Sequence, residues 1–266
     1  IIIMTFKIKI GTAGNIDNGI LKSLVKLKKL GLDGQEVEFV RGVRMGNSLA
    51  KEVGLLRKKL KLELSVHAPY YINLCSVEKI KIKDSMKRIL KSCEKMYYLG
   101  GGNVVFHAAY YGKRSKKEVY DFVSERIGEM QDVIKDEGFK KVKLAPETTG
   151  KASQFGDLDE LLQLVKETKC GICVDFAHLL ARDGKIDYDS VMKKIKHLKH
   201  VHCHFSGIEF SAKGERRHLI TKGKDIKELL SYLKKYKINC MIINESPNPL
   251  GDTLKTKKIL EGMKLR

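Results

Sequence analysis

The sequence predicts one α/β domain, a single (β/α)8 TIM barrel that spans residues 1–266. Eight short apolar runs recur along the chain, and amphipathic stretches with helical spacing separate them. A strand that alternates with a helix eight times over about 250 residues is the pattern of such a barrel. No linker or low-complexity tract interrupts the series. The expected strands are 6–10, 37–41, 62–67, 103–107, 142–147, 171–175, 200–205 and 239–245.

The helical stretches carry start and stop signals. Ser115 with Glu118, and Asp157 with Glu160, are spaced as capping boxes, and glycines such as Gly31 stand where helices end. The competing architecture is an open doubly wound sheet, which would carry a Gly-rich phosphate loop after its first strand. Residues 11–14 (Gly-Thr-Ala-Gly) are too short for that fingerprint. We therefore expect one closed barrel.

Composition excludes several classes of protein. A hydrophobic content of 42% is too high for a disordered chain, and no apolar run approaches the ~20 residues that span a bilayer. We expect a cytoplasmic protein with no membrane partner. The net charge of +20 favours nucleic acid, although a Lys-rich, Gln-poor surface of the kind found in hyperthermophiles explains it equally well. The six Cys are expected to be packing thiols, including the Cys170–Cys173 pair, which has zinc-ligand spacing but no second pair.

Six successive predicted strands end in His, Asp or Glu, and one further His follows the sixth strand by three residues. Active sites of such barrels lie at the carboxyl ends of the strands. Without a metal, so many titratable groups in one place would repel or lose solvation. Imidazole and carboxylate ligands suit Zn²⁺ or Mn²⁺, and seven candidates exceed one tetrahedral site, so we expect at least two ions. The candidates are His67, His107, Glu147, Asp175, His178, His204 and Glu245.

The seventh strand carries three histidines at a period of two, so that all of them face the same way. Only His204 is placed to reach the mouth of the barrel. We expect His202 to be a core histidine or to support the ligands from below.

Several segments resemble one known family. They include residues 67–74 (His-Ala-Pro-Tyr-Tyr-Ile-Asn-Leu), 146–150 (Pro-Glu-Thr-Thr-Gly), 173–178 (Cys-Val-Asp-Phe-Ala-His), 204–207 (His-Phe-Ser-Gly) and 244–248 (Asn-Glu-Ser-Pro-Asn). Their order and spacing are similar to the endonuclease IV family of apurinic/apyrimidinic endonucleases, over residues 7–250.

The resemblance implies a cluster of two or three Zn²⁺ ions, with Mn²⁺ as an alternative. It implies that His67 and His107 bind one metal and share Glu147 with a second, whose other ligands are Asp175, His204 and Glu245. Glu147 and Glu245 are then the catalytic carboxylates, Glu147 as the bridge and Glu245 as the group that orients the nucleophile.

For the third metal the resemblance implies His178. The family's remaining ligands come from an Asp-x-His loop after the seventh strand, but this chain has Gly-Glu-Arg-Arg-His over 214–218. Glu215 and His218 are the available substitutes, at a spacing that differs by one residue. A further departure is Thr148, where many relatives have Asn.

The resemblance also implies a substrate: double-stranded DNA with abasic or 3′-blocked sites, cut on the 5′ side to leave a 3′-hydroxyl by an enzyme that we expect to be a monomer. Tyr70, Tyr71, Arg41 and Arg44 follow the second and third strands, and such side chains suit stacking on bases and holding phosphates. Packing over the mouth explains the Tyr pair equally well. Further candidate phosphate contacts, otherwise ordinary surface residues, are Lys113, Arg114, Lys213, Arg216 and Arg217.

Two other functions stay open. Glu147, Asp175, His204 and Glu245 also match the single-metal pattern of sugar isomerases and epimerases of the same barrel superfamily, but one metal leaves His67, His107 and His178 without a shared role. A non-catalytic barrel that binds nucleic acid through its positive charge would have no need of a carboxylate-rich centre.

Overall fold

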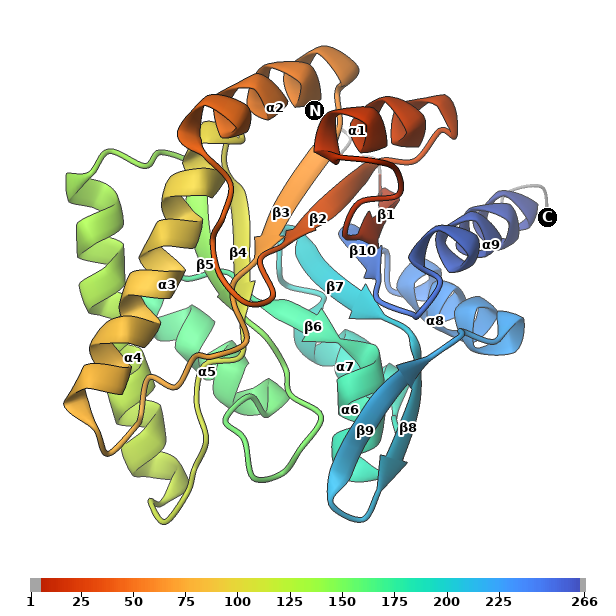
Figure 1. Cartoon of the computed structure of the whole chain (residues 1–266). Helices are drawn as coiled ribbons and strands as arrows, with labels where there is room; N and C mark the ends of the chain where they lie inside the picture. The colour runs from red at the N-terminus through yellow and green to blue at the C-terminus, as the bar shows by residue number, and fades with distance from the viewer. Residues whose placement is uncertain (1–5, 264–266) are drawn as a thin grey trace, which may run out of the picture.

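The computed structural model describes residues 6–263, in which eight parallel strands form a barrel surrounded by helices (Figure 1). Neighbouring strands follow the order β5-β4-β3-β2-β1-β10-β7-β6. The eight-stranded barrel predicted from the sequence is therefore confirmed. Its strands are β1 (Ile8–Ala13), β2 (Gly34–Glu38), β3 (Glu63–His67), β4 (Gly102–Phe106), β5 (Val142–Pro146), β6 (Cys173–Asp175), β7 (Val201–Phe205) and β10 (Cys240–Asn244).

The barrel closes between β5 and β6, the two ends of the sheet. Glu147, directly after β5, forms an isolated parallel bridge with Cys173, and the Thr148 N–H donates to the Cys173 carbonyl at 3.0 Å. The hydroxyl oxygen of Thr148 accepts from the Asp175 N–H at 2.8 Å. These contacts bring the ends of both strands together at the mouth.

The second strand begins and ends three residues earlier than the expected 37–41. The strand begins with Gly34 and Gln35, which are not apolar, so a search for apolar runs misses its start. Both residues nevertheless have a place in the barrel. A Cβ on Gly34 would collide with the Glu63 carbonyl oxygen, so only glycine allows these strands to approach, and the Gln35 side chain accepts a hydrogen bond from Ser23 at 2.6 Å. In the observed register Glu38 pairs with His67, which places Glu38 at the mouth.

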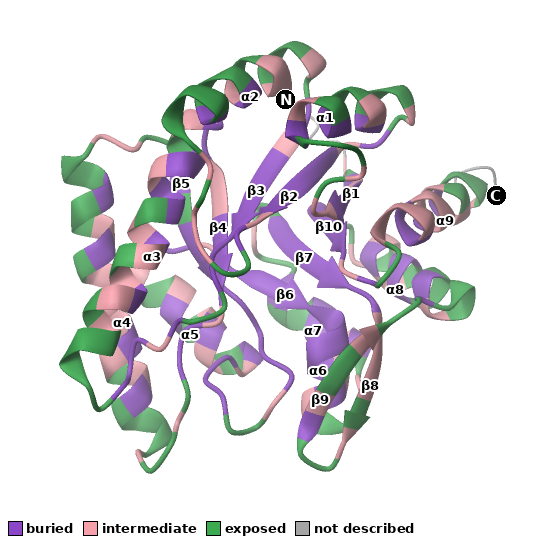
Figure 2. Cartoon of the chain, viewed as in Figure 1, coloured by how far each residue is buried: buried purple, intermediate pink, exposed green. Residues whose placement is uncertain are grey.

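Helices cover the outside of the barrel, with their buried faces toward the strands (Figure 2). Both expected capping boxes are confirmed, Ser115 with Glu118 and Asp157 with Glu160. No helix in residues 6–263 combines the length and apolarity that crossing a bilayer requires. The helices are α1 (Ile20–Lys29), α2 (Asn47–Leu60), α3 (Lys79–Tyr98), α4 (Lys116–Asp136), α5 (Leu158–Thr168), α6 (Phe176–Asp183), α7 (Tyr188–Ile195), α8 (Gly223–Lys235) and α9 (Pro249–Gly262).

An antiparallel hairpin that the sequence did not reveal lies between β7 and α8. It consists of β8 (Gly207–Ser211) and β9 (Gly214–Leu219) and extends beyond the carboxyl ends of the barrel strands beside α6 (Figure 1).

The interior of the barrel contains both apolar and polar buried residues. Val105, Ala145 and Cys173 form a small buried cluster. Glu36 and His202, from other strands, are polar and buried. All six cysteines are free and buried, which agrees with packing thiols. The buried polar residues inside the barrel lie directly beneath the groups at its mouth.

Two helical glycines test the packing of helices against one another. A Cβ on Gly54 of α2 would collide with the Tyr98 carbonyl at the end of α3, whereas a Cβ on Gly128 of α4 would meet nothing within 4 Å. We expect Gly128→Ala to raise the free energy of unfolding by about 1 kcal/mol. Gly54→Ala should lower it by roughly 1–3 kcal/mol, because overpacking outweighs helix propensity. Urea denaturation measures both, and stabilisation by Gly54→Ala would contradict the packing.

Candidate metal centre

The residues expected at the strand ends meet around one cavity of about 470 Å³ at the mouth of the barrel. Asp175 and His204 lie just beneath it and are fully buried. The structure thus brings together every metal ligand named from the sequence, including the two on the hairpin. Those that line the cavity are His67, His107, Glu147, His178, Glu215, His218 and Glu245.

Glu147 lies at the centre of this arrangement and is 1% exposed. Its Oε2 atom is 3.2 Å from Nε2 of both His67 and His107. Its Oε1 atom is 3.2 Å from Nδ1 of His204 and 3.2 Å from Nδ1 of His178. One carboxylate therefore faces two groups of imidazoles through its two oxygens, which is the arrangement that a bridging ligand requires.

Three histidines are anchored through one ring nitrogen. The Nδ1 atoms of His67, His178 and His218 lie 2.8, 2.9 and 3.1 Å from backbone carbonyl oxygens. Since a carbonyl only accepts, each Nδ1 carries the proton in the neutral ring, and Nε2 holds the lone pair. Histidines that bind metals are oriented in this way. Nε2 of His178 lies 3.3 Å from Nε2 of His218, so two lone pairs face each other and a proton or a metal ion must lie between them.

His204 is anchored through its other ring nitrogen, Nε2, by a residue that was not predicted from the sequence. Its Nε2 atom makes an ion-pair contact of 2.8 Å with Oε1 of Glu36, and its Nδ1 atom is 3.2 Å from Glu147 and from Oε1 of Glu245. The other oxygen of Glu36 accepts from His202 at 2.7 Å and from Ser65 at 2.6 Å. Glu36 thus supports His204 from inside the barrel, and His202 has the supporting place expected for it.

The signal for Glu36 and Glu38 was present in the sequence as an alternation of Glu with apolar residues over 36–39. It was lost because the strand was placed three residues too late. Glu38 lines the cavity, and burial raises the pKa of its carboxyl to about 8.

The buried carboxylates of the cluster need positive charge close to them. Burial alone would raise the pKa of Glu147, but the imidazoles of His204 and His107 hold it well below its usual value. Burial opposes charge on His67 as well, yet hydrogen bonding to Glu147 and the charge of Glu38 raise the pKa of His67 to about 10. Without metal ions, protons on the imidazoles balance the buried carboxylates. Metal ions would replace those protons, since metal binding releases protons from its ligands.

The donors fit divalent metal ions in both type and spacing. Ligand atoms at the usual Zn–N and Zn–O distances in a tetrahedral site lie about 3.3 Å apart. The contacts at Glu147, between His204 and Glu245, and between His178 and His218 are 3.2–3.3 Å. Five sets of residues have donor atoms within 4.8 Å of one another. Three of them contain the expected ligands: His67, His107 and Glu147; Glu147, Asp175, His204 and Glu245; and Asp175, His178 and His218.

A β-bulge explains how Glu215 and His218 face the same cavity. Residues three apart on a regular strand face opposite sides. Along β9, however, Arg217 pairs with Glu209 and Glu215 pairs with Phe210, which leaves Arg216 as an extra residue. Gly150 allows the hairpin to approach, since a Cβ there would lie 2.7 Å from that of Glu215. Glu215 Oε2 lies 3.5 Å from Nε2 of His178, and that neighbour lowers the carboxyl pKa to about 2 against the effect of burial.

The residues expected to contact DNA are only partly at the cavity. Tyr70 lines it and is 58% exposed. Tyr71 is exposed beside it, and Arg41 and Arg44 line the neighbouring cavity.

Several of the additional basic residues are engaged within the protein. Arg114 is not the free phosphate contact that we expected: it donates to the carbonyl of Cys75 and lies over the Phe122 ring, because the loop folds back on α4. On the hairpin, Arg216 and Arg217 form ion pairs with Glu209 at 3.5 and 2.7 Å.

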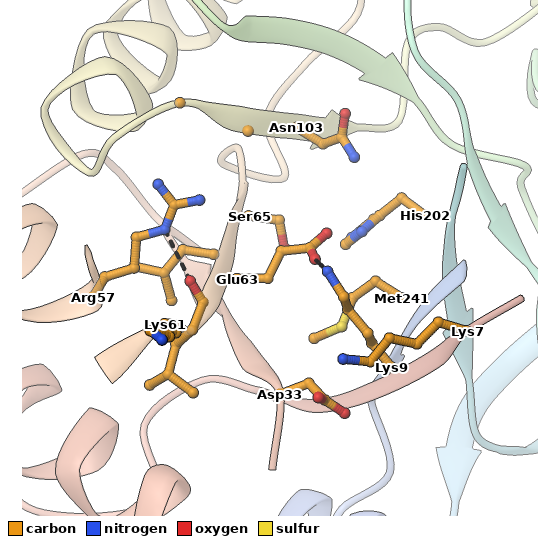
Figure 3. A pocket seen from close by; sticks show the side chains of 14 residues that line it. Lys7, Lys9, Asp33, Arg57, Lys61, Glu63, Ser65, Asn103, His202 and Met241 are labelled. Carbon is orange, nitrogen blue, oxygen red and sulfur yellow. Dashed lines mark hydrogen bonds and ion pairs between the residues drawn. The ribbon is translucent and has the colours of Figure 1, made fainter. Parts of the chain in front are cut away.

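A second cavity of about 440 Å³ lies at the opposite end of the barrel (Figure 3). Its charged side chains largely satisfy one another or the backbone: Lys9 pairs with Glu63 at 2.5 Å, and Arg57 donates to the Leu62 carbonyl at 3.0 Å. Asp33 and Glu63 belong to none of the candidate metal-ligand groups found in residues 6–263, and only His202 of this lining does, together with Cys173 and His204.

Comparison with known proteins assigns the family. Residues 24–265 match the family described as xylose isomerase-like TIM barrel. The chain belongs to this family. An uncharacterized protein of Methanocaldococcus jannaschii is 38% identical over 239 residues, which cover 85% of this chain and 86% of that protein. A probable endonuclease 4 of Mycoplasmopsis pulmonis is 30% identical over 178 residues, covering 60% of this chain and 61% of that protein.

Solved structures with a similar fold include an endonuclease and several epimerases. SacUVDE superposes with a TM-score of 0.77 at 14% identity, over 97% of this chain and 99% of that one. Endonuclease IV from Thermus thermophilus gives 0.69 at 18% identity, over 97% and 100%. A D-tagatose 3-epimerase-like protein gives 0.72 at 21% identity, over 97% of each chain. At these identities the likeness concerns the fold alone.

The support that Glu36 gives to His204 can be tested through metal affinity. Glu36→Gln keeps the size of the side chain but removes the negative charge that holds Nε2 of His204. We expect Zn²⁺ to bind about 10–100-fold more weakly, the usual cost of losing a partner behind a metal ligand. Chelator competition measures the affinity. Glu63→Gln, at the opposite end of the barrel, is the control, and equal affinities in both variants would contradict the role of Glu36.

Proposed function

We propose that the chain is a metal-dependent DNA repair endonuclease that hydrolyses the phosphodiester 5′ to an abasic site and leaves a 3′-hydroxyl. The observation that carries the proposal is the position of Glu147 between two sets of nitrogen donors, each at 3.2 Å from one of its oxygens. A bridging carboxylate is what a site for paired metal ions needs, and paired ions suit the displacement at a phosphodiester.

The residues divide into three proposed metal positions. His67, His107 and Glu147 would hold the first, and Glu147, Asp175, His204 and Glu245 would hold the second. His178, His218 and Glu215 would hold the third. Bound divalent ions supply Lewis acidity toward the phosphoryl group and lower the pKa of water, so the protein needs no separate base with a tuned pKa.

The protein's own groups position the substrate around this centre. Tyr70 is exposed at the lip of the cavity, where its ring is available to stack on a base. Glu245, held by His204, faces the cavity and is placed to orient the attacking group. The net charge of +20 favours a polyanionic substrate. The relatives named endonuclease 4 support this assignment over the part of the chain that they match.

The alternative is a single-metal sugar isomerase or epimerase. It is favoured by the compact set of Glu147, Asp175, His204 and Glu245, and by epimerases among the similar folds. It leaves His67, His178 and His218 unexplained, although each is anchored through Nδ1 with Nε2 turned toward the centre. We therefore favour the nuclease.

Incision of a defined lesion tests the proposal. The purified protein with Zn²⁺ should cut a 5′-labelled duplex at a central abasic-site analogue, and chelation should stop the reaction. Glu147→Gln should slow incision by a factor on the order of 10³, since it removes several kcal/mol of transition-state stabilisation with the bridge. Glu63→Gln should retain activity.

An intact duplex after Zn²⁺ and Mn²⁺ have each been restored would overturn the nuclease. Conversion of a ketose to its C3 epimer under the same conditions would support the alternative.

The number of metal ions tests the third position. We expect three Zn²⁺ per chain, and two in a Glu215→Ala/His218→Ala variant, measured by elemental analysis of the dialysed protein. Arg217→Ala, on the same strand but outside the cavity, is the control and should keep three. Equal metal content in both variants would show that the hairpin contributes no metal ligands.

A further inference from the structure

A further cavity adjoins the proposed metal centre. It has a volume of about 600 Å³ and is lined by the segment that follows β1 and the segment that follows β2. It shares Gly14, Glu38 and Val40 with the metal cavity, so the two are continuous at the mouth. Its size is within the range of small-molecule sites. We refer to it as the flanking cavity.

The lining of the flanking cavity combines apolar walls with two arginines. Ile20, Val37 and Phe39 are buried residues of the lining, and Met45, just before α2, and Leu49, in its first turn, also line it. Arg41 and Arg44 complete the lining. Both arginines are exposed.

Val40 stands where the two cavities meet, and its backbone is held in an unfavourable conformation. Its φ of 20° is an outlier for a β-branched residue, and its side chain is 40% exposed. Two hydrogen bonds hold the turn: the Tyr70 N–H donates to the Val40 carbonyl at 3.0 Å, and the Gly42 N–H donates to the Phe39 carbonyl at 2.6 Å. Strain that the surroundings maintain in this way is typical of ligand sites.

We propose that the flanking cavity binds the nucleobase of the nucleotide adjacent to the phosphate that is cut. Apolar walls suit the faces of a planar ring, and guanidinium groups both stack on bases and bind phosphates. The adjoining metal centre takes the phosphate. A sugar substrate has no planar apolar ring to bury between Phe39 and Leu49, so the cavity favours a nucleotide. This inference rests on the proposed nuclease function and adds to it a requirement for a base beside the cut.

Binding of small fragments to the Zn²⁺-loaded full chain tests the inference. Deoxyadenosine 3′-monophosphate and 2-deoxyribose 3-phosphate offer the same phosphate to the metals, on the 3′-oxygen as in the nucleotide upstream of the cut, and differ by the base. We expect the nucleotide to bind about tenfold more tightly by calorimetry, which is the usual value of stacking one base on protein side chains. Equal affinities in the parent protein would overturn the proposal.

Two leucines of α2 provide a matched pair of variants. Leu49→Asp places a carboxylate in the wall of the flanking cavity and should abolish the preference for the nucleotide. Leu55→Asp changes the same residue type on the same helix outside this cavity and should keep the preference. Both leucines are exposed, at 37% and 73%, so both variants should fold. A preference that survives in Leu49→Asp would overturn the site.

Incision of the abasic duplex is measured on the same preparations. Incision without any preference for the nucleotide contradicts the flanking cavity alone. An inactive protein that fails to cut with either metal contradicts the nuclease, and the present inference with it.

Discussion

The buried carboxylate of Glu147 is the constraint on which the rest of the site depends. Its two oxygens each contact two imidazole nitrogens at 3.2 Å, in a place with almost no access to water. Placing a carboxylate there costs several kcal/mol unless positive charge compensates it. Glu147 also sits at the closure of the barrel, paired with Cys173 across the gap between β5 and β6. The residue at the centre of the cluster thus also joins the two ends of the sheet.

The histidines around Glu147 are oriented by groups that are not themselves candidate metal ligands. Backbone carbonyls hold His67, His178 and His218, and Glu36 holds His204 from the interior of the barrel. Each anchor selects which ring nitrogen faces the centre. Anchoring of this kind reduces the freedom that metal binding would otherwise have to remove, and it raises the basicity of the ligand. Buried polar residues inside the barrel thus support the ligands at its mouth.

The choice between an isomerase or epimerase and a nuclease rests on the residues of the site in this xylose isomerase-like barrel. Fold similarity extends to both kinds of enzyme, so it does not choose between them. The additional donors on β3, on β4 and on the hairpin favour a centre for several ions. The flanking cavity adds an apolar surface next to that centre, and the two features together fit a nucleotide better than a sugar.

The sequence by itself determined the eight strands, the capped helices and the residue types at the strand ends. Those features depend on periodicity and on neighbours within a few positions, which a single chain displays directly. Tertiary structure decided the register of β2, because Gly34 and Gln35 belong to the strand only through contacts with Glu63 and Ser23. It decided the bulge that turns Glu215 and His218 to one side, and the engagement of Arg114 with Cys75. These features depend on which distant segments meet, and no local pattern records that.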